Sequence, residues 1–321
     1  MASLLNIGVC GADGELATGK PFCDLIKGRM KGVIFADNGV TFSEADMASQ
    51  TTFAAAVQTK SRAARGSRIY PIWNLNNFED KTGDPNRGGV GNLTTKQIIT
   101  SSPIPQFDIA HSGGELLHKK LLQLEVGSYD IFLVDSNNVV YGKATSTGEL
   151  GGYTIYQNYV YPSKFIVSDA VNQFRFEVTL DSYQEYRDSA SFFAADSSIA
   201  DINGINNVVV TLFNQTTNVA KIKLVADGGK NLFDLSSIKT AMTTAGSIIA
   251  TNKQTGASFT ITSVAATDTT NKVFTVTLDN TAYGLLSSGD KVTIDMAAPS
   301  VLYANAIDGF ESTGGVDVTH A

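Results

Sequence analysis

One segment near the start of the chain has glycines and a lysine at the spacing of a phosphate-binding loop. In GADGELATGKP (11–21), Gly14, Gly19 and Lys20 fit the frame G-x4-G-K, in which backbone N–H groups and the lysine hold phosphate. The next residue is Pro21, where such a loop needs a Ser or Thr hydroxyl for magnesium, and proline also lacks a backbone N–H. We therefore expect a glycine-rich terminal loop here rather than a nucleotide site.

The histidines and carboxylates do not have the spacing of a catalytic or metal site. A glycine-containing turn separates His111 from His118, and His320 lies near the C-terminus, whereas a zinc site needs about three protein ligands with matched spacing. With 31 acidic residues in the chain, neighbouring pairs such as Glu79 and Asp80 are expected by chance. We expect no catalytic residue, no metal ligand and no cofactor, and hence a protein that is not an enzyme.

Aromatic residues gather in a short stretch that offers a second kind of chemistry, stacking against sugar rings. A stripe of this kind more often belongs to a core or to a subunit interface, so both interpretations stay open. The residues are Tyr153, Tyr156, Tyr159, Tyr161 and Phe165.

Length and composition limit the classes of protein to which the chain can belong. A chain of 321 residues predicts two domains, and 43% hydrophobic residues can bury a sizeable core. Charged residues make up only 17%, below the usual quarter, and Thr, Ser, Asn and Gly replace them, as in turn-rich β proteins that cover their surface with other protein. The net charge of −7 argues against a general affinity for nucleic acid or anionic membranes.

The N-terminal residues and the cysteines indicate a protein folded in a cytoplasm. MASLLNIGVCGADGE lacks a basic region, and no stretch approaches the roughly 18 apolar residues of a membrane span, so we expect neither a secretory signal nor a membrane partner. Cys10 and Cys23 give no disulfide framework or metal spacing and are expected to be reduced.

The strongest helix signal follows an extended segment at 33–40. Ser43 precedes Glu44-Ala45-Asp46, a capping-box pattern with acidic residues in the first turn, and basic residues accumulate before Gly66. This order of charges predicts a helix over about 43–64.

A polar segment then follows the extended residues 68–75. NNFEDKTGDPNRGGVGN (76–92) lacks periodicity, and a loop of this length in a compact domain tends to be functional. We expect a loop arm that reaches a neighbouring subunit. The candidate interface residues are Asn76, Glu79, Asp80, Lys81, Asp84 and Arg87 of this arm, with Arg62 and Arg65 from the end of the predicted helix.

The middle of the chain is predicted to be mainly β. Leucines at 114–124 fit either a helix or an edge strand. Strands separated by turn residues follow from 128, and in 172–181 apolar Phe174 and Phe176 alternate with Arg175 and Glu177. This alternation indicates a half-buried antiparallel strand with one wet or subunit-facing side.

Composition changes near residue 200, where threonine-rich, short alternating strands begin. Their number and spacing over 205–304 are typical of an Ig-like β-sandwich, and 305–321 reads as a Gly/Thr-rich tail. The residues expected to point inward are Ile222, Leu224, Phe259, Ile261, Phe274, Val276, Leu278, Val292 and Ile294.

The layout is therefore mainly β (α+β). An antiparallel sandwich or barrel-forming core with one long helix occupies 1–204, and the Ig-like sandwich follows. It resembles bacteriophage tail tube proteins, in which a β core assembles into rings and an outer Ig-like domain is often appended. The resemblance rests on the strand block 128–181, the helix after FSEAD (42–46), the segment 76–92, and GASFTITSV…KVFTVTLD…SSGDKVTIDM in the last domain.

The resemblance implies a mechanical function. The chain would be a virion protein made in the host bacterial cytoplasm, and its subunits would form homo-oligomeric rings, hexameric in such families, that close a β-barrel without exposed edges. Its partners would be other virion proteins, and DNA would pass through the tube without specific binding. Two alternatives are an auxiliary capsid or head decoration protein with an Ig-like domain, and a carbohydrate-binding, adhesin-like module.

Overall fold

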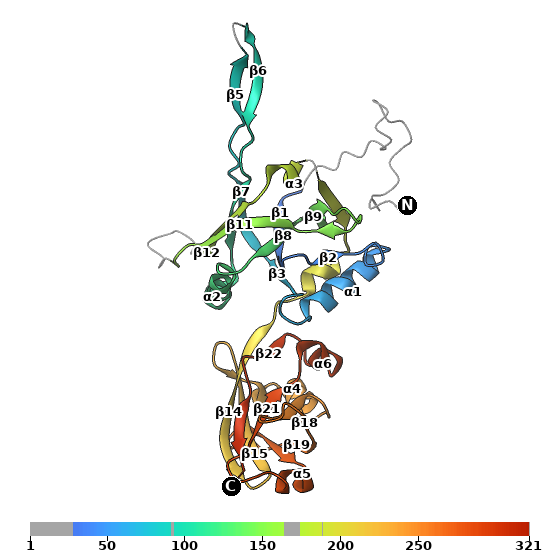
Figure 1. The fold of residues 1–321 in the computed structure, drawn as a ribbon, viewed down its shortest axis with the longest axis vertical. Helices are drawn as coiled ribbons and strands as arrows, with labels where there is room; N and C mark the ends of the chain where they lie inside the picture. Colours follow the sequence, from blue (N-terminus) through green and yellow to red (C-terminus); the bar gives the residue numbers. More distant parts are fainter. Residues whose placement is uncertain (1–27, 91–92, 164–173, 188, 321) are drawn as a thin grey trace. The chain divides into compact units, whose positions relative to one another are not determined.

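The computed structural model of the chain describes residues 28–90, 93–163, 174–187 and 189–320 (Figure 1). The segment 11–21, both cysteines and Phe165 lie outside the described residues. The fold is mainly β with interspersed helices and antiparallel sheets, which confirms the predicted fold class. The described residues form two compact units: the first contains those up to Ser61 and those between Arg65 and Asn203, and the second contains Arg62–Ala64 and those from Gly204 onwards.

The first unit contains one large sheet of eleven strands. The strands are β1 (Met30–Asp37), β2 (Thr41–Phe42), β3 (Ile69–Trp73), β4 (Leu75–Asp80), β7 (Gln106–His111), β8 (Tyr129–Asp135), β9 (Val139–Ala144), β10 (Leu150–Gly151), β11 (Tyr153–Val160), β12 (Phe174–Leu180) and β13 (Ala190–Ala194).

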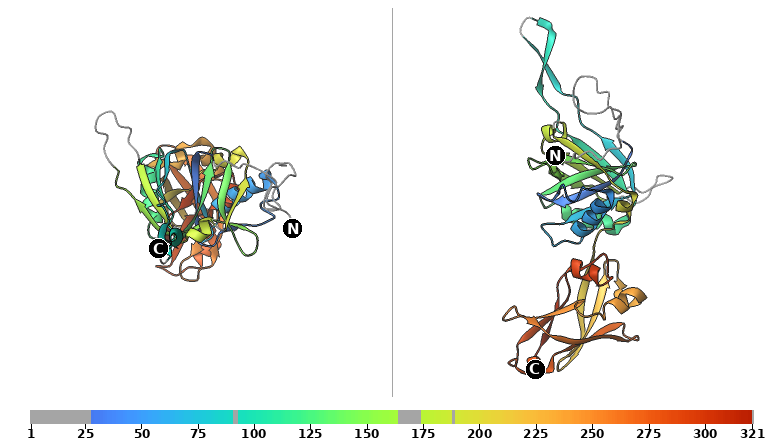
Figure 2. Two further views of the ribbon diagram at one scale, coloured as in Figure 1. Left: turned by 90° about the horizontal axis from the view of Figure 1, so that it is seen from above. Right: turned by 90° about the vertical axis from the view of Figure 1, so that its right-hand side faces the viewer.

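This sheet is curled, as Figure 2 shows, and apolar side chains form a core on its inner face. Strand β8 pairs with β1, β1 pairs with β3, and the chain turns at Asn74 (φ 61°) from β3 into β4. Asparagine tolerates this left-handed conformation better than most residues. The pairings β4–β7, β7–β12 and β12–β11 then lead back to β8, through the pair Tyr153 and Ile131. The circuit of strands therefore returns to the strand from which it began.

Strands β1 and β8 are buried on both faces, which explains their continuous apolar sequences. In β1, Val33 and Phe35 face the core inside the curled sheet, whereas Ile34 and Ala36 face a second core. That second core lies between the sheet and helix α1 (Gln50–Ser61), which contributes Phe53.

Helix α1 is shorter than the predicted helix over 43–64, because the sequence carries two start signals. The first forms a reciprocal cap, with N–H of Ser43 donating to Asp46 at 2.9 Å and N–H of Asp46 donating to Ser43 at 3.2 Å, but only a turn follows. A second reciprocal pair, Ser49 and Thr52, starts the helix itself.

The predicted loop arm over 76–92 was wrong in its secondary structure. Residues 76–80 of the predicted arm belong to β4. Further along, β5 (Asn86–Val90) pairs with β6 (Leu93–Ser101) in a two-stranded ribbon. This ribbon pairs with no other described strand, and Figure 1 draws it apart from the curled sheet. A ribbon without a core of its own needs no alternating apolar pattern, which is why the sequence reads as a loop.

The remaining helices of the first unit are short. The ambiguous segment at 114–124 is a helix, α2, and not an edge strand. The helices are α2 (Gly114–Leu124), α3 (Tyr183–Arg187) and η2 (Ser197–Asp201).

The second unit is a sandwich of two sheets. The six-stranded sheet contains β14 (Asn206–Thr216), β15 (Val219–Ala226), β16 (Lys230–Asn231), β19 (Ile261–Asp268), β20 (Val273–Leu278) and β22 (Phe310–Ser312). The four-stranded sheet contains β17 (Ile248–Asn252), β18 (Ser258–Phe259), β21 (Lys291–Met296) and β23 (Val316–Thr319). Its helices are η3 (Leu232–Asp234), α4 (Ser236–Ala241), α5 (Asn280–Gly284) and α6 (Pro299–Ala304).

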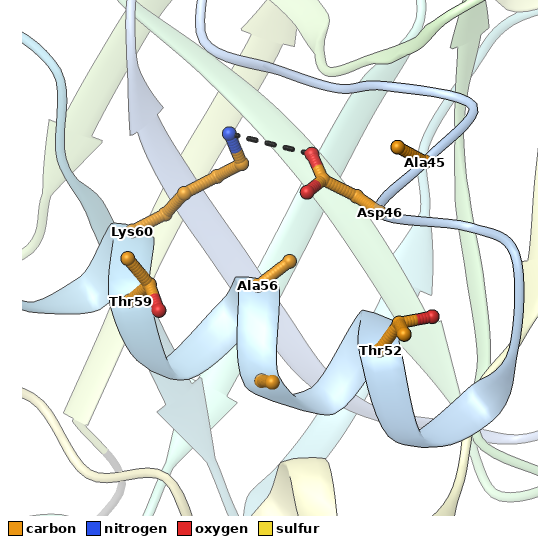
Figure 3. A pocket seen from close by; sticks show the side chains of 7 residues that line it. Ala45, Asp46, Thr52, Ala56, Thr59 and Lys60 are labelled. Atoms are coloured by element: carbon orange, nitrogen blue, oxygen red, sulfur yellow. Dashed lines mark ion pairs between the residues drawn. The ribbon is translucent and has the colours of Figure 1, made fainter.

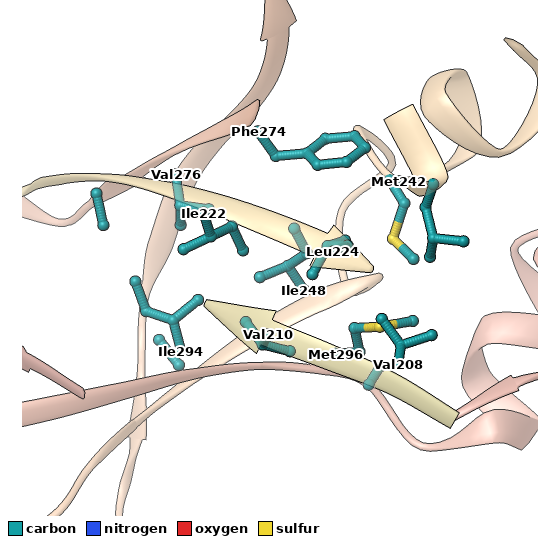
Figure 4. Close-up of a cluster of buried hydrophobic side chains, with 14 of the residues drawn as sticks. Val208, Val210, Ile222, Leu224, Met242, Ile248, Phe274, Val276, Ile294 and Met296 are labelled. Carbon is teal, nitrogen blue, oxygen red and sulfur yellow. The ribbon is translucent and has the colours of Figure 1, made fainter. Parts of the chain in front are cut away.

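Side chains from both sheets of the second unit share one core (Figure 4). Ile222 and Phe274 come from the six-stranded sheet, and Ile248 and Ile294 from the four-stranded sheet. The predicted inward residues are confirmed: seven are buried in this core, while Phe259 and Ile261 are partly buried against it.

The predicted tail at 305–321 was also wrong, because its residues complete both sheets. Strand β22 pairs in parallel with β14, and β23 pairs with β21. Val318 is fully buried in the core of the second unit. Glycine and threonine around these short strands conceal the alternation of Val316 and Val318 in the sequence.

Candidate assembly surface

Six of the eight predicted interface residues lie on β4, on β5 or in the connection between these two strands. Because β4 pairs with β7 on one side only, it is an edge of the curled sheet. All six residues are exposed. They are Asn76, Glu79 and Asp80 on β4, Lys81 and Asp84 in the connection that follows, and Arg87 on β5.

The two predicted arginines do not belong to this group. Arg62 is only 2% exposed and forms an ion pair with Asp308, so it is not available on the surface of the chain. Arg65 is exposed but lies in the turn after α1. Arg62 was therefore wrongly included, because a basic residue at a helix end looks the same in the sequence whether it is solvated or buried in an ion pair.

Three carboxylates stand side by side across the strands next to this edge. Glu79 of β4 is opposite Asp108 of β7, and Asp108 is opposite Glu177 of β12. Side chains on paired residues point to the same face of a sheet, so the three share one face. Phe107 and Phe176, their neighbours in sequence, point to the core.

Asp108 is the centre of this polar face. Its side chain is nearly buried (3% exposed), and it accepts hydrogen bonds from Lys81 Nζ at 2.8 Å and Arg175 Nε at 3.1 Å. Burial by itself raises the pKa of Asp108, but the hydrogen bonds from Arg175 and Lys81 outweigh it and hold the pKa below its ordinary value. The carboxylate therefore stays ionised, which suits an anchor and not a general acid.

Glu177 extends the network towards β11. It accepts hydrogen bonds from the Tyr161 hydroxyl at 2.9 Å and from the Gln106 side chain at 2.5 Å. The guanidinium of Arg175 lies over the Tyr161 ring, 5.4 Å from its centroid. The alternation in β12 had predicted that Arg175 and Glu177 share a wet face, whereas Asp108, flanked by two apolar core residues, gave no signal in the sequence.

The aromatic stripe predicted from 153 onwards does not form one groove. Tyr153 is buried in the core of the curled sheet, whereas Tyr156 is 72% exposed and Tyr159 is 46% exposed. The Tyr159 and Tyr161 rings meet edge to face at 5.0 Å. A sugar-binding platform needs several rings on one face, and these rings are divided between the core and the surface.

A pocket of about 340 Å³ opens between α1 and the turn that precedes it (Figure 3). Its one ion pair joins Lys60 Nζ and Asp46 Oδ2 at 3.6 Å, and its other lining residues are small. Such a lining can accommodate a side chain but brings no pair of reactive groups together. In the part of the chain that the structure describes, no group of three or more His, Cys, Asp and Glu residues could hold a metal ion.

No family model matches the chain, and no curated protein matches it in sequence. Within the described residues, no helix is both long enough and apolar enough to cross a membrane.

Proposed function

We propose that the chain is a structural subunit of a bacteriophage virion, a tail tube protein that polymerises as stacked rings around a DNA conduit. The observation that carries this proposal is the β5–β6 arm, residues 86–101, whose two strands pair only with each other among the described strands. A lone two-stranded ribbon is marginally stable in water, and its open edges are a template for pairing with another chain. An arm of this kind gains stability when a second subunit covers it.

Hydrogen bonds at the root of the arm, where it leaves the curled sheet, favour one fixed direction in which the arm can contact another subunit. The Lys81 N–H donates to the Gln106 carbonyl at 2.8 Å, and the Lys81 side chain binds the buried Asp108 carboxylate. These bonds tie both ends of the arm to the curled sheet. An arm that binds a different surface on the next copy makes a heterologous contact, and such contacts generate rings or open filaments.

The curled sheet and the charge of the chain fit the same assembly. Edge strand β4 carries exposed Glu79 and Asp80, and charged side chains discourage uncontrolled edge-to-edge pairing. The net charge of −7 suits a conduit in which DNA slides without sticking. The second unit has its own core and its own two sheets, as expected for an appended Ig-like module.

The proposal is tested with a variant that lacks the β5–β6 arm but keeps β4 intact. Lys81 and Thr82 lie opposite Gln106, so residues 83–104 can be replaced by an Asn-Gly turn that joins β4 directly to β7. We expect this variant to fold and to remain monomeric in sedimentation velocity, while the full chain forms large polymers as its concentration rises. A control carries Asn-Gly in place of Gln254–Thr255, an exposed turn of the second unit, and polymerises normally.

Two outcomes would contradict the proposal. Normal polymers from the arm variant would show that the arm is not the joint between subunits. A full chain that stays monomeric at every concentration would contradict the tail tube and favour the head decoration protein, which needs a preformed shell as its partner.

A further inference from the structure

Two buried histidines meet beneath helix α2. His111 on β7 is fully buried, and His118 on α2 is 3% exposed. Their ring centroids are 5.8 Å apart. Both rings also pack against Phe174 of β12, at 5.6 and 5.1 Å. The pair therefore lies where the inner side of α2 docks on the curled sheet.

The hydrogen bonds of the two rings define their tautomers. The Gly113 N–H donates to His111 Nδ1 at 3.1 Å, so the proton of neutral His111 is on Nε2. His118 Nε2 lies 2.7 Å from the Tyr161 carbonyl oxygen, which only accepts, so the proton of His118 is on that nitrogen.

One atom of each ring remains without a partner. His111 Nε2, a donor, and His118 Nδ1, an acceptor, are both buried and have no hydrogen-bond partner among the described residues. Protonation of His111 leaves only N–H donors on its ring, so Nδ1 can no longer accept from the Gly113 N–H, and it places a positive charge in an apolar site, which is costly.

The charged groups of the surrounding elements face elsewhere. On β7 and β12, Asp108, Arg175 and Glu177 lie on the opposite face of the sheet, where Asp108 binds Arg175 and Glu177 binds Tyr161. On α2 itself, Glu115 and Lys119 are exposed and Lys120 is half-buried. At the end of the helix, Glu125 accepts a hydrogen bond from the Val160 N–H of β11.

We propose that His111, packed against His118, forms an acid-sensitive latch: while His111 is neutral, α2 stays docked on the sheet, and proton uptake by His111 releases the helix. Release uncovers Leu121 and Phe174. Leu116 and Leu122 of α2 are already exposed, so release adds Leu121 to the apolar surface of the helix. The latch acts within one subunit and does not depend on polymerisation.

The direction of the pH effect follows from the burial of His111. Burial, and then the neighbouring His118, lower the pKa of His111 to about 4, whereas an exposed histidine has a pKa near 6.5. Above pH 6.5 the docked and released forms are both neutral at this residue. As the pH falls from 6.5 to 4, only the released form takes up the proton, so docking weakens about tenfold per pH unit.

The experiment is hydrogen exchange of the full chain at low concentration, analysed by mass spectrometry with correction for the intrinsic rate at each pH. Between pH 7.5 and 4.5 we expect protection of 114–124 to fall on the order of a hundredfold. Protection of α1 should stay unchanged. Constant protection of 114–124, or an equal loss in α1, would overturn the latch.

Variants separate the latch from general acid sensitivity. His118→Gln retains an N–H that can reach the Tyr161 carbonyl, and His111→Phe fills the same apolar site; neither new side chain takes up a proton. We expect the double variant to keep α2 protected at pH 4.5, and an unchanged hundredfold loss in it would contradict the proposal. His320→Gln, in the second unit, is the control and should retain the loss.

Discussion

Lys81 Nζ lies 2.8 Å from Asp108 Oδ2, which joins the root of the β5–β6 arm to a nearly buried carboxylate of the curled sheet. Arg175 of the neighbouring strand binds the same carboxylate. One acidic side chain thus holds two cations, one from the connection after β4 and one from β12. Because Asp108 has little access to water, this arrangement is worth more than an ion pair on the surface.

Removal of the Asp108 carboxylate should destabilise the first unit. In Asp108→Ala, Lys81 and Arg175 lose their shared partner, and we expect a loss of roughly 1–3 kcal/mol in the free energy of unfolding. Urea denaturation measures this loss. The matched control is Lys272→Ala, whose ion pair with Asp234 is about half exposed on both sides and should contribute less than about 1 kcal/mol. Equal effects of the two substitutions would contradict the anchoring role of Asp108.

The same carboxylate predicts a pH dependence. The hydrogen bonds to Asp108 hold its pKa below the ordinary value near 3.9, so the folded chain binds this proton less readily than the unfolded chain does. Its contribution to stability is present above about pH 4 and is lost as the pH falls further. The difference in stability between the wild-type chain and Asp108→Asn should therefore narrow below pH 4. If this difference in the free energy of unfolding stayed constant down to pH 3, the lowered pKa of Asp108 would be contradicted.

Gly142 of β9 has no room for a side chain. A Cβ atom at this position would lie 2.2 Å from the Gly151 carbonyl oxygen, a backbone atom of β10 that cannot move aside cheaply. Gly142→Ala should lower the free energy of unfolding by about 2 kcal/mol or more, measured by thermal or urea unfolding. Gly83→Ala is the control, because a Cβ there meets nothing within 4 Å. It should leave stability almost unchanged.

Val318 tests whether the C-terminal residues belong to the second unit. It is fully buried in the shared core, so Val318→Ala should cost roughly 1–3 kcal/mol. Val301→Ala, on the outer side of α6 and 44% exposed, removes the same two methyl groups and should change stability by less than about 0.5 kcal/mol. If both substitutions had the same small effect, residues 316–319 would not be part of the fold.

The strands that face a core were predictable because burial leaves a pattern in the sequence. The alternation around Phe274 and Val276 is the alternation of core and surface in β20. The apolar run at 33–36 reflects two cores, one on each face of β1. The same alternation predicts that Arg175 and Glu177 lie on one polar face of β12, as its pairing with β7 places them.

The elements that were missed lack such a pattern for physical reasons. The β5–β6 arm has no core to face, and its glycines and asparagines are typical of a loop. The helix start was misplaced because Ser43 and Ser49 both form caps and only the second opens a continuous helix. Asp108 was missed because a charge between two core-facing residues becomes meaningful only when its partners, which are distant in sequence, are known.

Negative-stain electron microscopy of the purified full chain, before and after its concentration is raised, tests the central claim most directly. If the chain is a tail tube subunit, rings or hollow tubes of uniform width appear, and they are absent when residues 83–104 are replaced by the Asn-Gly turn. Dispersed monomers or small compact oligomers from the full chain at high concentration would contradict the proposed function.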